Sequence, residues 1–444
     1  MKISHISNSF IVVDSSETRI ICDPWVGRAN YGGWHSFPEY SKEDLANIVM
    51  AADYIYISHI HDDHLDDNFL DFSGIKNKTF VIKNFRHKHL LNKLKLFGIY
   101  NIVEVDEFSK VALKDLSVAI FPQMTSTSSG IDDDVNYDMD TSIVISDSKN
   151  IFFNQVDNPL SKVDFIHIAK WIKKEFGPID FACLMCGAAG EYPQFFMNIN
   201  QREEKERIIN NSLAKLLDAL DALSPKYYFP AGGTYFIPGK LASFNNGIAQ
   251  PTFDQINVAI KSTSMDVKPL FLEGGHTVEY SGDQICTSNL ITPIVGNITQ
   301  SIALHGLDLY DFEYDQPPNV EKLLEIFALS RNNWLDKVSK DKIKISQDIE
   351  FCLYSQLKIF DGKPDLNKKI LELQLFKSPL KLGSLKIHID IRAFKRCLTR
   401  SQIWNGTLGA LCLFDRSPNI HYPNDFFSMN FFGLSKSQLE NLSS

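Results

Sequence analysis

Three histidines and an aspartate stand within six residues of one another in the segment YISHIHDDHLDD, residues 56–67. The core of this segment reads His59-x-His61-x-Asp63-His64. Imidazole and carboxylate groups are the usual protein ligands of zinc, iron and manganese. Carboxylates crowded together repel one another unless a cation lies among them. The segment therefore predicts a metal site, and the alternative is a solvated polar turn.

The apolar segment DYIYIS ends just before these histidines and is expected to be the strand that positions them. Extended backbone with a period of two residues would place His59 and His61 on one side. Similar strands alternate with helices over the first 160 residues, including SKEDLANIVMAA with Ser41 as its N-cap. A longer helix is expected over residues 198–223. Alternating β and α elements with buried strands predict an α/β layered fold.

The chain has 444 residues, which is enough for two or three domains. The pattern changes over residues 295–320, where YDFEYDQPPNV is typical of a linker. We expect a catalytic domain over residues 1–300. A smaller α/β domain, whose role the sequence does not indicate, is expected over residues 301–444.

Composition excludes several classes of function. The net charge is −9 and there is no dense run of Lys or Arg, so no nucleic-acid partner is expected. No stretch of eighteen apolar residues occurs, so no membrane span is expected. The N-terminus lacks the apolar region of a signal peptide. Seven scattered cysteines fit a reducing compartment, and we expect a cytoplasmic protein.

The H-x-H-x-D-H motif after an apolar strand resembles the signature of the metallo-β-lactamase fold. Other segments resemble the branch of that superfamily that holds CMP-N-acetylneuraminate hydroxylases and ascorbate-lactonase-like enzymes. These segments are IICDPWVGRANYGGW, MDTSIVI with FFNQVDN, CGAAGEYP, YYFPAGG and IWNGTLGALCLFDRSPNIHYPNDFF. The resemblance implies an αββα sandwich with a smaller C-terminal α/β domain. It also implies that Asp157 is the aspartate that bridges the metal ions.

The chain departs from that pattern at several places. The hydroxylases carry a Rieske iron–sulfur module, whose paired Cys/His ligand clusters are absent from this sequence. The family's third histidine is also missing, because no histidine occurs between His89 and His167. We expect Gln123, Asn136 or Asp138 to substitute for it. The family's last histidine would fall where this chain has Pro-Ala-Gly-Gly, residues 230–233.

The remaining ligand set is His59, His61, Asp63, His64 and Asp157. One ion held by His59, His61 and Asp157 would have two histidines and one carboxylate, which suits non-haem iron chemistry and also hydrolysis at a single zinc. Asp63 and His64 would hold a second ion or orient water and ligands. The predicted cofactors are one or two transition-metal ions, zinc or iron. Asp63 or Asp157 would act in catalysis by orienting water or moving its proton.

Further residues are expected around the ligands. Asp23 follows a strand and would accept a hydrogen bond from a ligand histidine. His5 is placed like a histidine near the start of the resembled branch and would support the edge of the site. His305 has no ligand-like neighbours in the sequence and is expected to be structural. Residues expected to contact the substrate are Trp34 at the entrance, Gly187, Gly232 and Gly233, which permit close backbone approach, and His276, in a turn after two glycines.

Three functions follow. The favoured one is a metal-dependent hydrolase in which metal-bound water attacks an ester, lactone or phosphodiester. The alternative is a non-haem iron hydroxylase of a nucleotide-linked or amino sugar, supplied with electrons by a separate protein. The third is a degenerate, non-enzymatic scaffold, because two of the usual ligand positions are lost. In both enzymatic cases the partner is a small-molecule substrate.

Overall fold

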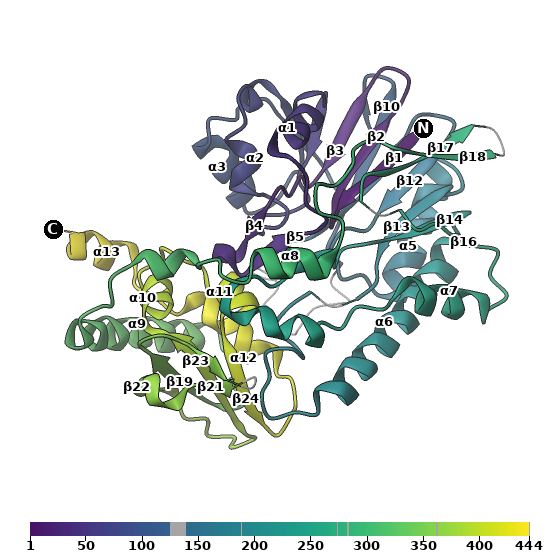
Figure 1. The fold of residues 1–444 in the computed structure, drawn as a ribbon. Coiled ribbons are helices and arrows are strands. Elements are labelled where there is room, and N and C mark those ends of the chain that lie inside the picture. The colour runs from purple at the N-terminus through teal and green to yellow at the C-terminus, as the bar shows by residue number, and fades with distance from the viewer. Residues whose placement is uncertain (125–138, 188, 273, 282–283, 361–362, 444) are drawn as a thin grey trace.

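Two β-sheets pack face to face and form the centre of the fold (Figure 1). The computed structural model describes residues 1–444 except 125–138, 188, 273, 282–283, 361–362 and 444. The first sheet has the order β18-β17-β1-β2-β3-β6-β7-β8. Its strands are β1 (Lys2–Ser7), β2 (Phe10–Asp14), β3 (Arg19–Cys22), β6 (Tyr54–Tyr56), β7 (Thr79–Lys83), β8 (Ile102–Val105), β17 (His276–Ser281) and β18 (Gln284–Asn289).

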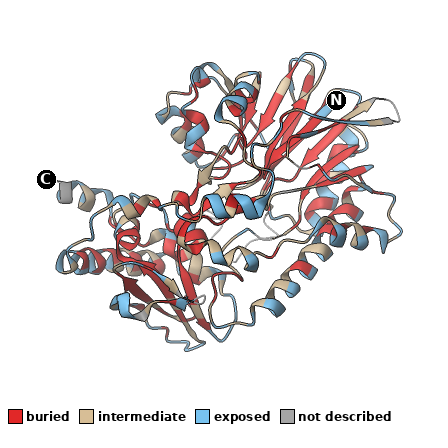
Figure 2. Ribbon diagram, viewed as in Figure 1, coloured by how far each residue is buried: buried red, intermediate tan, exposed pale blue. Residues whose placement is uncertain are grey.

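The second sheet has the order β16-β14-β13-β12-β11-β10-β9. Its strands are β9 (Val111–Leu113), β10 (Leu116–Pro122), β11 (Thr141–Ser146), β12 (Ile151–Asn154), β13 (Phe181–Met185), β14 (Tyr227–Ala231) and β16 (Lys268–Pro269). Every residue of β11 and β12 is buried, as expected of central strands that are covered on both faces. Figure 2 shows the central strands of both sheets as largely buried, whereas the edge strand β18 is mostly exposed.

Helices cover the outer faces of the two sheets. Helices α1 (Lys42–Met50), α2 (Asp67–Leu70) and α3 (His89–Leu96), with the 3-10 turn η2 (Ile75–Asn77), pack on the first sheet. Helices α5 (Lys162–Glu175), α6 (Gln201–Leu223) and α7 (Phe253–Lys261) pack on the second. The four layers make the αββα sandwich that the sequence predicted.

Helix boundaries follow the capping residues. Ser41 caps α1 as predicted, because its side chain accepts a hydrogen bond from the N–H of Asp44. Helix α6 begins at Gln201 and not at residue 198, because Asn200 accepts from the N–H of Glu203 and so fixes the start. Where the chain turns sharply, several glycines have a positive φ, which glycine adopts without steric strain because it has no Cβ.

A small sheet connects the sandwich to the C-terminal part. It has the order β15-β5-β4, with β4 (Arg28–Ala29), β5 (Trp34–Ser36) and β15 (Tyr235–Phe236). Around it lie η1 (Asn30–Gly32), η4 (Gly239–Gly247), α8 (Ile298–Leu304) and η5 (Asp311–Tyr314). Figure 1 shows β4, β5 and α8 between the sandwich and the C-terminal helices.

The C-terminal part has a four-stranded sheet of order β22-β19-β23-β24. Its strands are β19 (Asp348–Tyr354), β22 (Lys369–Phe376), β23 (Ser384–Asp390) and β24 (Leu413–Ser417), beside the pair β20 (Ile359–Phe360) and β21 (Lys363–Pro364). The helices are α9 (Val320–Lys340), η6 (Leu366–Lys368), α10 (Ile391–Leu398), α11 (Trp404–Leu411), α12 (Pro423–Phe427), η7 (Ser428–Phe431) and α13 (Lys436–Ser443). Their core also includes Trp25, Trp34 and Phe195 from the sandwich side, so the division near residue 300 stays a prediction.

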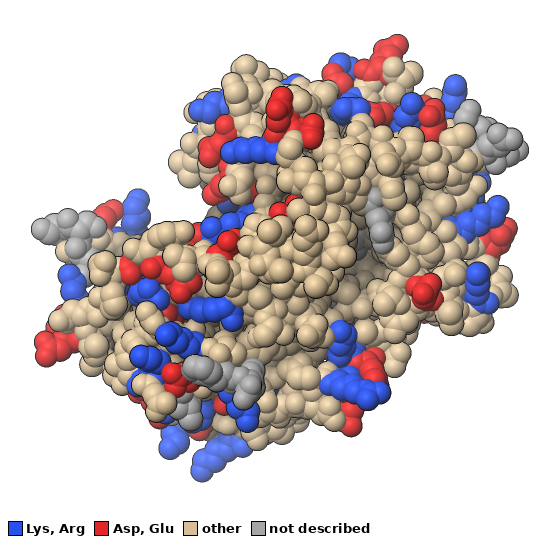
Figure 3. Space-filling view, viewed as in Figure 1, with Lys and Arg blue, Asp and Glu red and all other residues tan. Residues whose placement is uncertain are grey.

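None of the helices in the described residues is long and apolar enough to cross a membrane. On the face drawn in Figure 3, basic and acidic side chains are interspersed. The expectation about nucleic acid stays a prediction.

Candidate metal centre

The three histidines of the metal motif lie in one tight loop between β6 and α2, where Asp66 caps the helix. The N–H groups of His64 and Leu65 both donate to the carbonyl of His61, at 3.0 and 2.8 Å. This turn gathers the rings. The centroid of the His59 ring lies 4.6 Å from that of His61 and 4.1 Å from that of His64.

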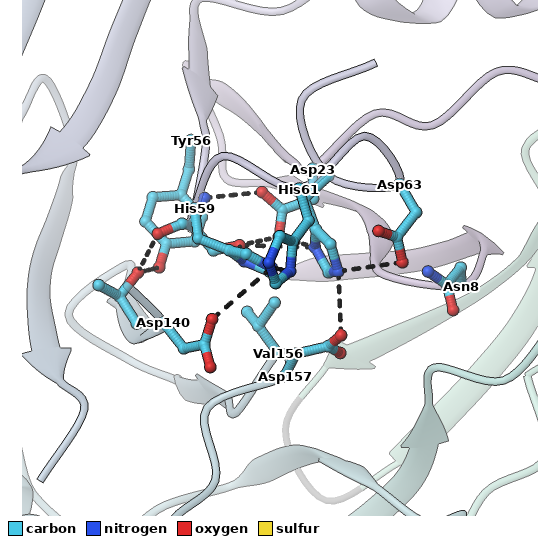
Figure 4. A network of polar contacts seen from close by, with 12 residues as sticks. Asn8, Asp23, Tyr56, His59, His61, Asp63, Asp140, Val156 and Asp157 are labelled. Carbon is cyan, nitrogen blue, oxygen red and sulfur yellow. Dashed lines mark hydrogen bonds and ion pairs between the residues drawn. The ribbon is translucent and has the colours of Figure 1, made fainter. Parts of the chain in front are cut away.

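The second sheet brings two carboxylates to the histidines (Figure 4). Asp140 precedes β11 and Asp157 follows β12, and these strands pair antiparallel, so both aspartates lie at the same edge of the sheet. The distance from Oδ1 of Asp140 to Nε2 of His59 is 3.7 Å. Oδ2 of Asp157 lies 3.1 Å from Nε2 of His64.

Asp23 orients two of the histidines, His59 and His64, on the side of each ring that faces away from the centre. Its Oδ2 accepts from Nδ1 of His64 at 3.0 Å and from the hydroxyl of Ser58 at 2.7 Å. Because that hydroxyl gives its single proton to Asp23, it accepts from Nδ1 of His59, 2.9 Å away. Both rings therefore carry a proton on Nδ1 and turn Nε2 toward the centre, where it is the atom available to a cation. The structure places Asp23 in the supporting position that the sequence suggested.

The backbone is in the left-handed region at two positions of the centre. Asp23 has a φ of 42° and Val156, just before Asp157, has a φ of 55°. A β-branched residue rarely adopts this conformation, which costs on the order of 1–3 kcal/mol and persists where surrounding contacts enforce it. The conformation of Asp23 directs its own carboxylate toward the histidines, and the conformation of Val156 directs the carboxylate of the next residue, Asp157, toward them.

His61 is supported from the C-terminal part of the chain. Its Nδ1 lies 2.9 Å from Nε2 of His59, and its Nε2 lies 3.0 Å from Nδ2 of Asn405 in α11. The oxygen and nitrogen of an amide are assigned from such contacts and can exchange by a flip. With the amide turned over, Oδ1 of Asn405 would accept a proton from Nε2 of His61, which would make Nδ1 the ligand atom.

The histidines are poised to bind a cation. Burial lowers the pKa of His59 well below its ordinary value and lowers the pKa of His61 to about 4. Both rings are therefore neutral at pH 7, which is the form that binds metal. Burial opposes charge on His64, but Asp157 and the other carboxylates near it hold the pKa of His64 well above its ordinary value. In the metal-free protein His64 is protonated and occupies the place of a cation among these acids.

Protonated His64 offsets only part of the negative charge of the carboxylates around it. Burial raises the pKa of Asp63 to about 6 and that of Asp140 to about 7, and nearby Asp157 adds to both shifts. Oδ1 of Asp140 is buried and has no hydrogen-bond partner among the described residues. An orphaned, buried carboxylate oxygen beside a neutral histidine is the arrangement expected of a metal ligand.

The first ligand group is His59, His61 and Asp140, whose ligand atoms all lie within 4.8 Å of one another. The sequence predicted that Asp157 completes the pair His59 and His61, and that the missing histidine is replaced at Gln123, Asn136 or Asp138. In the structure the residue that lies beside His59 and His61 as the third member of this group is Asp140. Asn136 and Asp138 lie outside the described residues, and Gln123 follows β10 with its buried Oε1 lacking a partner among the described residues.

The second ligand group is Asp63, His64 and Asp157. Oδ2 of Asp63 lies 3.5 Å and Oδ2 of Asp157 lies 3.1 Å from Nε2 of His64. His59 is also within 4.8 Å of His64 and Asp157, but one ring nitrogen binds one cation. The residues present therefore suit two adjacent cations, with Asp157 near both groups.

A cavity of about 390 Å³ opens onto both groups. Trp34 and Gly187, two of the residues predicted to contact the substrate, line it together with Asn405, and their contact with a substrate stays a prediction. Nε1 of Trp34 is buried and has no partner among the described residues, so it can donate to a substrate. The other lining residues are Asn30, His61, Asp63, Asp140, Asp157, Met185, Ala189, Gly190, Glu191, Gly406 and Gly409.

The structure places two predicted histidines elsewhere. His276 was expected in a turn, but it begins β17 and pairs with His5 across the sheet, because the turn ends at the two preceding glycines. His5 bonds through both ring nitrogens to the carbonyls of Leu272 and Asn8 at 2.9 Å. Both histidines line a separate cavity of about 510 Å³. Gly232 and Gly233 line that cavity and a narrow passage that also reaches Asp63 and Asp157.

Replacing Asp23 with alanine should weaken metal binding by about 10–100-fold, because it orients His64 and, through Ser58, His59. It should also destabilise the fold by about 1–3 kcal/mol, because the N–H of Ser58 loses its acceptor. Metal titration and thermal unfolding measure the two effects. Asp23→Asn is the matched control, since its oxygen can still accept from Ser58. Equal metal affinity in Asp23→Ala and the unaltered protein would contradict this role.

Acid should weaken metal binding below about pH 7. The carboxyls of Asp140 and Asp63, with pKa values of about 7 and 6, must lose protons to bind a cation, and so must His64. Affinity should be full at alkaline pH and fall up to about tenfold per pH unit for each group protonated. Titration calorimetry in buffers with different ionisation enthalpies should detect proton release near pH 7. Release of no protons and a flat affinity from pH 8 to pH 5.5 would exclude this ligand set.

These features define the class of protein. The αββα sandwich, the histidine loop after a strand of one sheet and the carboxylates from the other give this chain a fold of the metallo-β-lactamase type, as the sequence predicted, with residues at its centre that could hold metal. No family model matches the chain.

Curated relatives place the chain near the predicted branch. It is 26% identical over 245 residues to a cytidine monophosphate-N-acetylneuraminic acid hydroxylase from Danio rerio, covering 53% of this chain and 38% of the hydroxylase. It is 26% identical over 200 residues to a predicted Rieske 2Fe-2S iron–sulfur protein from Mycolicibacterium smegmatis, covering 44% of this chain and 36% of the relative. The matched region thus spans less than two fifths of either relative.

Solved structures with the fold are more distant. The chain is 14% identical to the isothiocyanate hydrolase from Delia radicum gut bacteria, with a TM-score of 0.44, covering 64% of this chain and 100% of the other. It is 14% identical to CmlA, a diiron β-hydroxylase from Streptomyces venezuelae, with a TM-score of 0.42. The match covers 65% of this chain and 54% of CmlA.

Proposed function

We propose that this chain is a non-haem iron enzyme that uses molecular oxygen to hydroxylate a small molecule. The observation that carries the proposal is the first ligand group, which has His59, His61 and the carboxylate of Asp140. Two histidines and one carboxylate with open coordination positions are typical of non-haem iron oxygenases. The same set also occurs at catalytic zinc sites, so the ligand group admits iron and the similarity to a CMP-N-acetylneuraminic acid hydroxylase favours it.

A nucleotide-linked or amino sugar is the substrate class that we propose. The similarity to a CMP-N-acetylneuraminic acid hydroxylase over about half of this chain supports it. A cavity of about 390 Å³ is in the size range of small-molecule sites. Hydroxylation puts one oxygen atom into a C–H bond and releases the other as water, which takes two electrons and two protons. We propose that a separate redox protein supplies these electrons.

The residues of the chain hold, orient and exchange protons. Bound ferrous iron would supply the oxygen chemistry that side chains lack. Asp23 fixes the ring nitrogens of His59 and His64 that face the cation, and Asn405 would do the same for His61 with its amide turned over. Asp63 lies on the cavity wall, and because burial raises its pKa to about 6, it can accept or return a proton near neutral pH.

A metal-dependent hydrolase of an ester, lactone or phosphodiester is the second candidate. The observation that favours it is the second ligand group, where Asp63 and Asp157 stand beside one cation position and could take a proton from water. The sequence alone favoured this reaction. The similarity to a CMP-N-acetylneuraminic acid hydroxylase, together with a ligand group that suits non-haem iron, is the reason to put the oxygenase first.

The two reactions are separated by loading the metal-free protein with either ferrous iron or zinc. The iron form, with a chemical reductant and mediator, is given oxygen and a panel of CMP-N-acetylneuraminate and free amino sugars. Mass spectrometry then looks for the gain of one oxygen atom. The zinc form is given ester, lactone and phosphodiester probes. His59→Ala is the inactive control, and His89→Ala, at an exposed histidine, is the matched control.

Oxygen insertion by the iron form and slow turnover by the zinc form would support the oxygenase. Fast hydrolysis by the zinc form, with no oxygen uptake by the iron form, would overturn it in favour of the hydrolase. Activity that persists in His59→Ala would exclude this centre from either reaction.

A further inference from the structure

A second cluster of metal-ligating side chains lies on the far side of β5 from the cavity. Successive residues of a strand point to opposite faces, so Trp34 faces the cavity and His35 points away from it. His35, Glu39 and His305 each offer one ligand atom, and these atoms lie within 4.8 Å of one another. None of the three belongs to the ligand groups of the first centre.

Both histidines of this cluster are fixed by their other ring nitrogen. Nδ1 of His305 lies 2.7 Å from Oδ2 of Asp308, and Nδ1 of His35 lies 2.9 Å from the carbonyl of Ser36. Because carbonyl and carboxylate oxygens only accept, each Nδ1 carries the proton and each Nε2 is turned to the cluster. A metal-ligating histidine typically donates its second N–H to a carboxylate or a backbone carbonyl in this way.

Glu39 completes the cluster with an oxygen that has no partner. Oε2 of Glu39 lies 3.0 Å from Nε2 of His305, while its Oε1 is buried and has no hydrogen-bond partner among the described residues. Only 12% of the Glu39 side chain and 23% of the His305 side chain are exposed. A carboxylate oxygen that is buried without a donor is unfavourable unless a cation approaches it.

Aromatic packing holds the two imidazoles side by side. Their centroids are 4.5 Å apart, and the ring of Phe236 stacks on His35 at 5.0 Å and contacts His305 at 5.6 Å. Because a carboxylate oxygen only accepts, Nε2 of His305 donates a proton to Oε2 of Glu39 when no metal is bound, and a bound cation would take the place of that proton.

We propose that His35, Glu39 and His305 bind one zinc ion, or a similar divalent transition-metal cation, at a site separate from the first centre. Two imidazole nitrogens and one carboxylate oxygen are ligands that zinc prefers, at bond lengths of about 2.0–2.2 Å. Ligand atoms of a tetrahedral zinc lie about 3.3 Å apart, and the Glu39–His305 pair is already at 3.0 Å.

The position of this site gives the ion a structural role. Glu39 and Val295 form a β-bridge, and the N–H of Ile294 donates to the carbonyl of Glu39. The carbonyl of His305 accepts from the N–H of Gly239. The segment between α8 and η5 leads into the C-terminal part. A cation here would therefore link this segment to the small sheet that contains Trp34. It would help to hold Asn405 and its helix near the first centre.

Zinc-edge anomalous diffraction and metal analysis test this proposal on the full-length protein. The protein is incubated with zinc chloride, and loosely bound ion is removed by gel filtration. We expect an anomalous peak bonded to Nε2 of His35 and of His305. We also expect His305→Gln to bind one zinc fewer per chain than the unaltered protein, and His89→Gln, at an exposed histidine, to bind the same number.

The first centre serves as an internal reference. His59→Ala should lose metal there and keep the zinc at His35, Glu39 and His305, so the two sites fail independently. Unchanged zinc content in a folded His305→Gln protein would overturn the proposal. If that variant does not fold, the anomalous map of the unaltered protein decides, and a map without a peak at the cluster would overturn the proposal.

Discussion

Replacing His59 with alanine should abolish metal binding at the first centre and reduce turnover to background. His59 contributes the ligand atom that is within reach of both groups, and its ring is buried between His61 and His64. Removing a residue that only orients a ligand weakens metal binding by about 10–100-fold, so removing the ligand should cost at least about 100-fold. Metal analysis after gel filtration and a turnover assay measure the two losses.

The control for this variant is a histidine outside both clusters. His89 is exposed on the first turn of α3, and His89→Ala should leave metal content and turnover unchanged. Near-normal iron content in a folded His59→Ala protein would show that the histidine loop does not hold the metal.

Replacing Asp140 should change which metal the centre uses. Asp140→Asn removes the negative charge but keeps the size of the side chain, and we expect at least about 10-fold weaker iron binding with loss of oxygen-dependent turnover. Asp140→His would make the first group a set of three histidines, which is typical of zinc. We expect this variant to retain metal, to prefer zinc over iron and to lose oxygen uptake.

Competition between ferrous iron and zinc for the two Asp140 variants measures this effect directly. The same preference in Asp140→His and in the unaltered protein would show that Asp140 is not a ligand, and would remove one of the two reasons to prefer an oxygenase. Because Asp140→Asn and Asp140→His both replace a buried side chain, thermal unfolding of each variant checks that the fold is retained.

The sequence predicted much of the fold because local signals agree with it. Apolar strands such as TSIVIS are fully buried in the structure, and Ser41 caps its helix through an ordinary side-chain hydrogen bond. The motif loop could be read in the same way, since its histidines and Asp63 are close together in the chain. Asp23 could be predicted as an acceptor because it follows a strand that ends beside β6.

Residues that meet only in the folded chain could not be predicted so well. Asp140 stands just before TSIVIS, and the strand order that aims it at His59 comes from pairing with β10 and β12. The signal that could have identified Asp140 is its place just before β11, because antiparallel pairing of β11 with β12 brings it to the same sheet edge as Asp157. Asn405 gave no signal, because 344 residues separate it from His61.

His305 shows the same limit. Its sequence neighbours contain no obvious second histidine, so a structural role was expected. In the structure it lies beside Glu39, which is 266 residues away in the chain, and its ring contacts that of His35. A cluster assembled from a strand, a loop and the end of a helix has no spacing that a sequence pattern can detect.

The most direct test of the central claim is the iron content of protein purified without oxygen, measured together with oxygen uptake on adding reductant and a CMP-linked sugar. We predict one or two iron ions per chain, oxygen uptake that depends on the sugar, and loss of both in His59→Ala. Protein that binds no iron under these conditions, or that binds iron equally well without His59, would contradict the account.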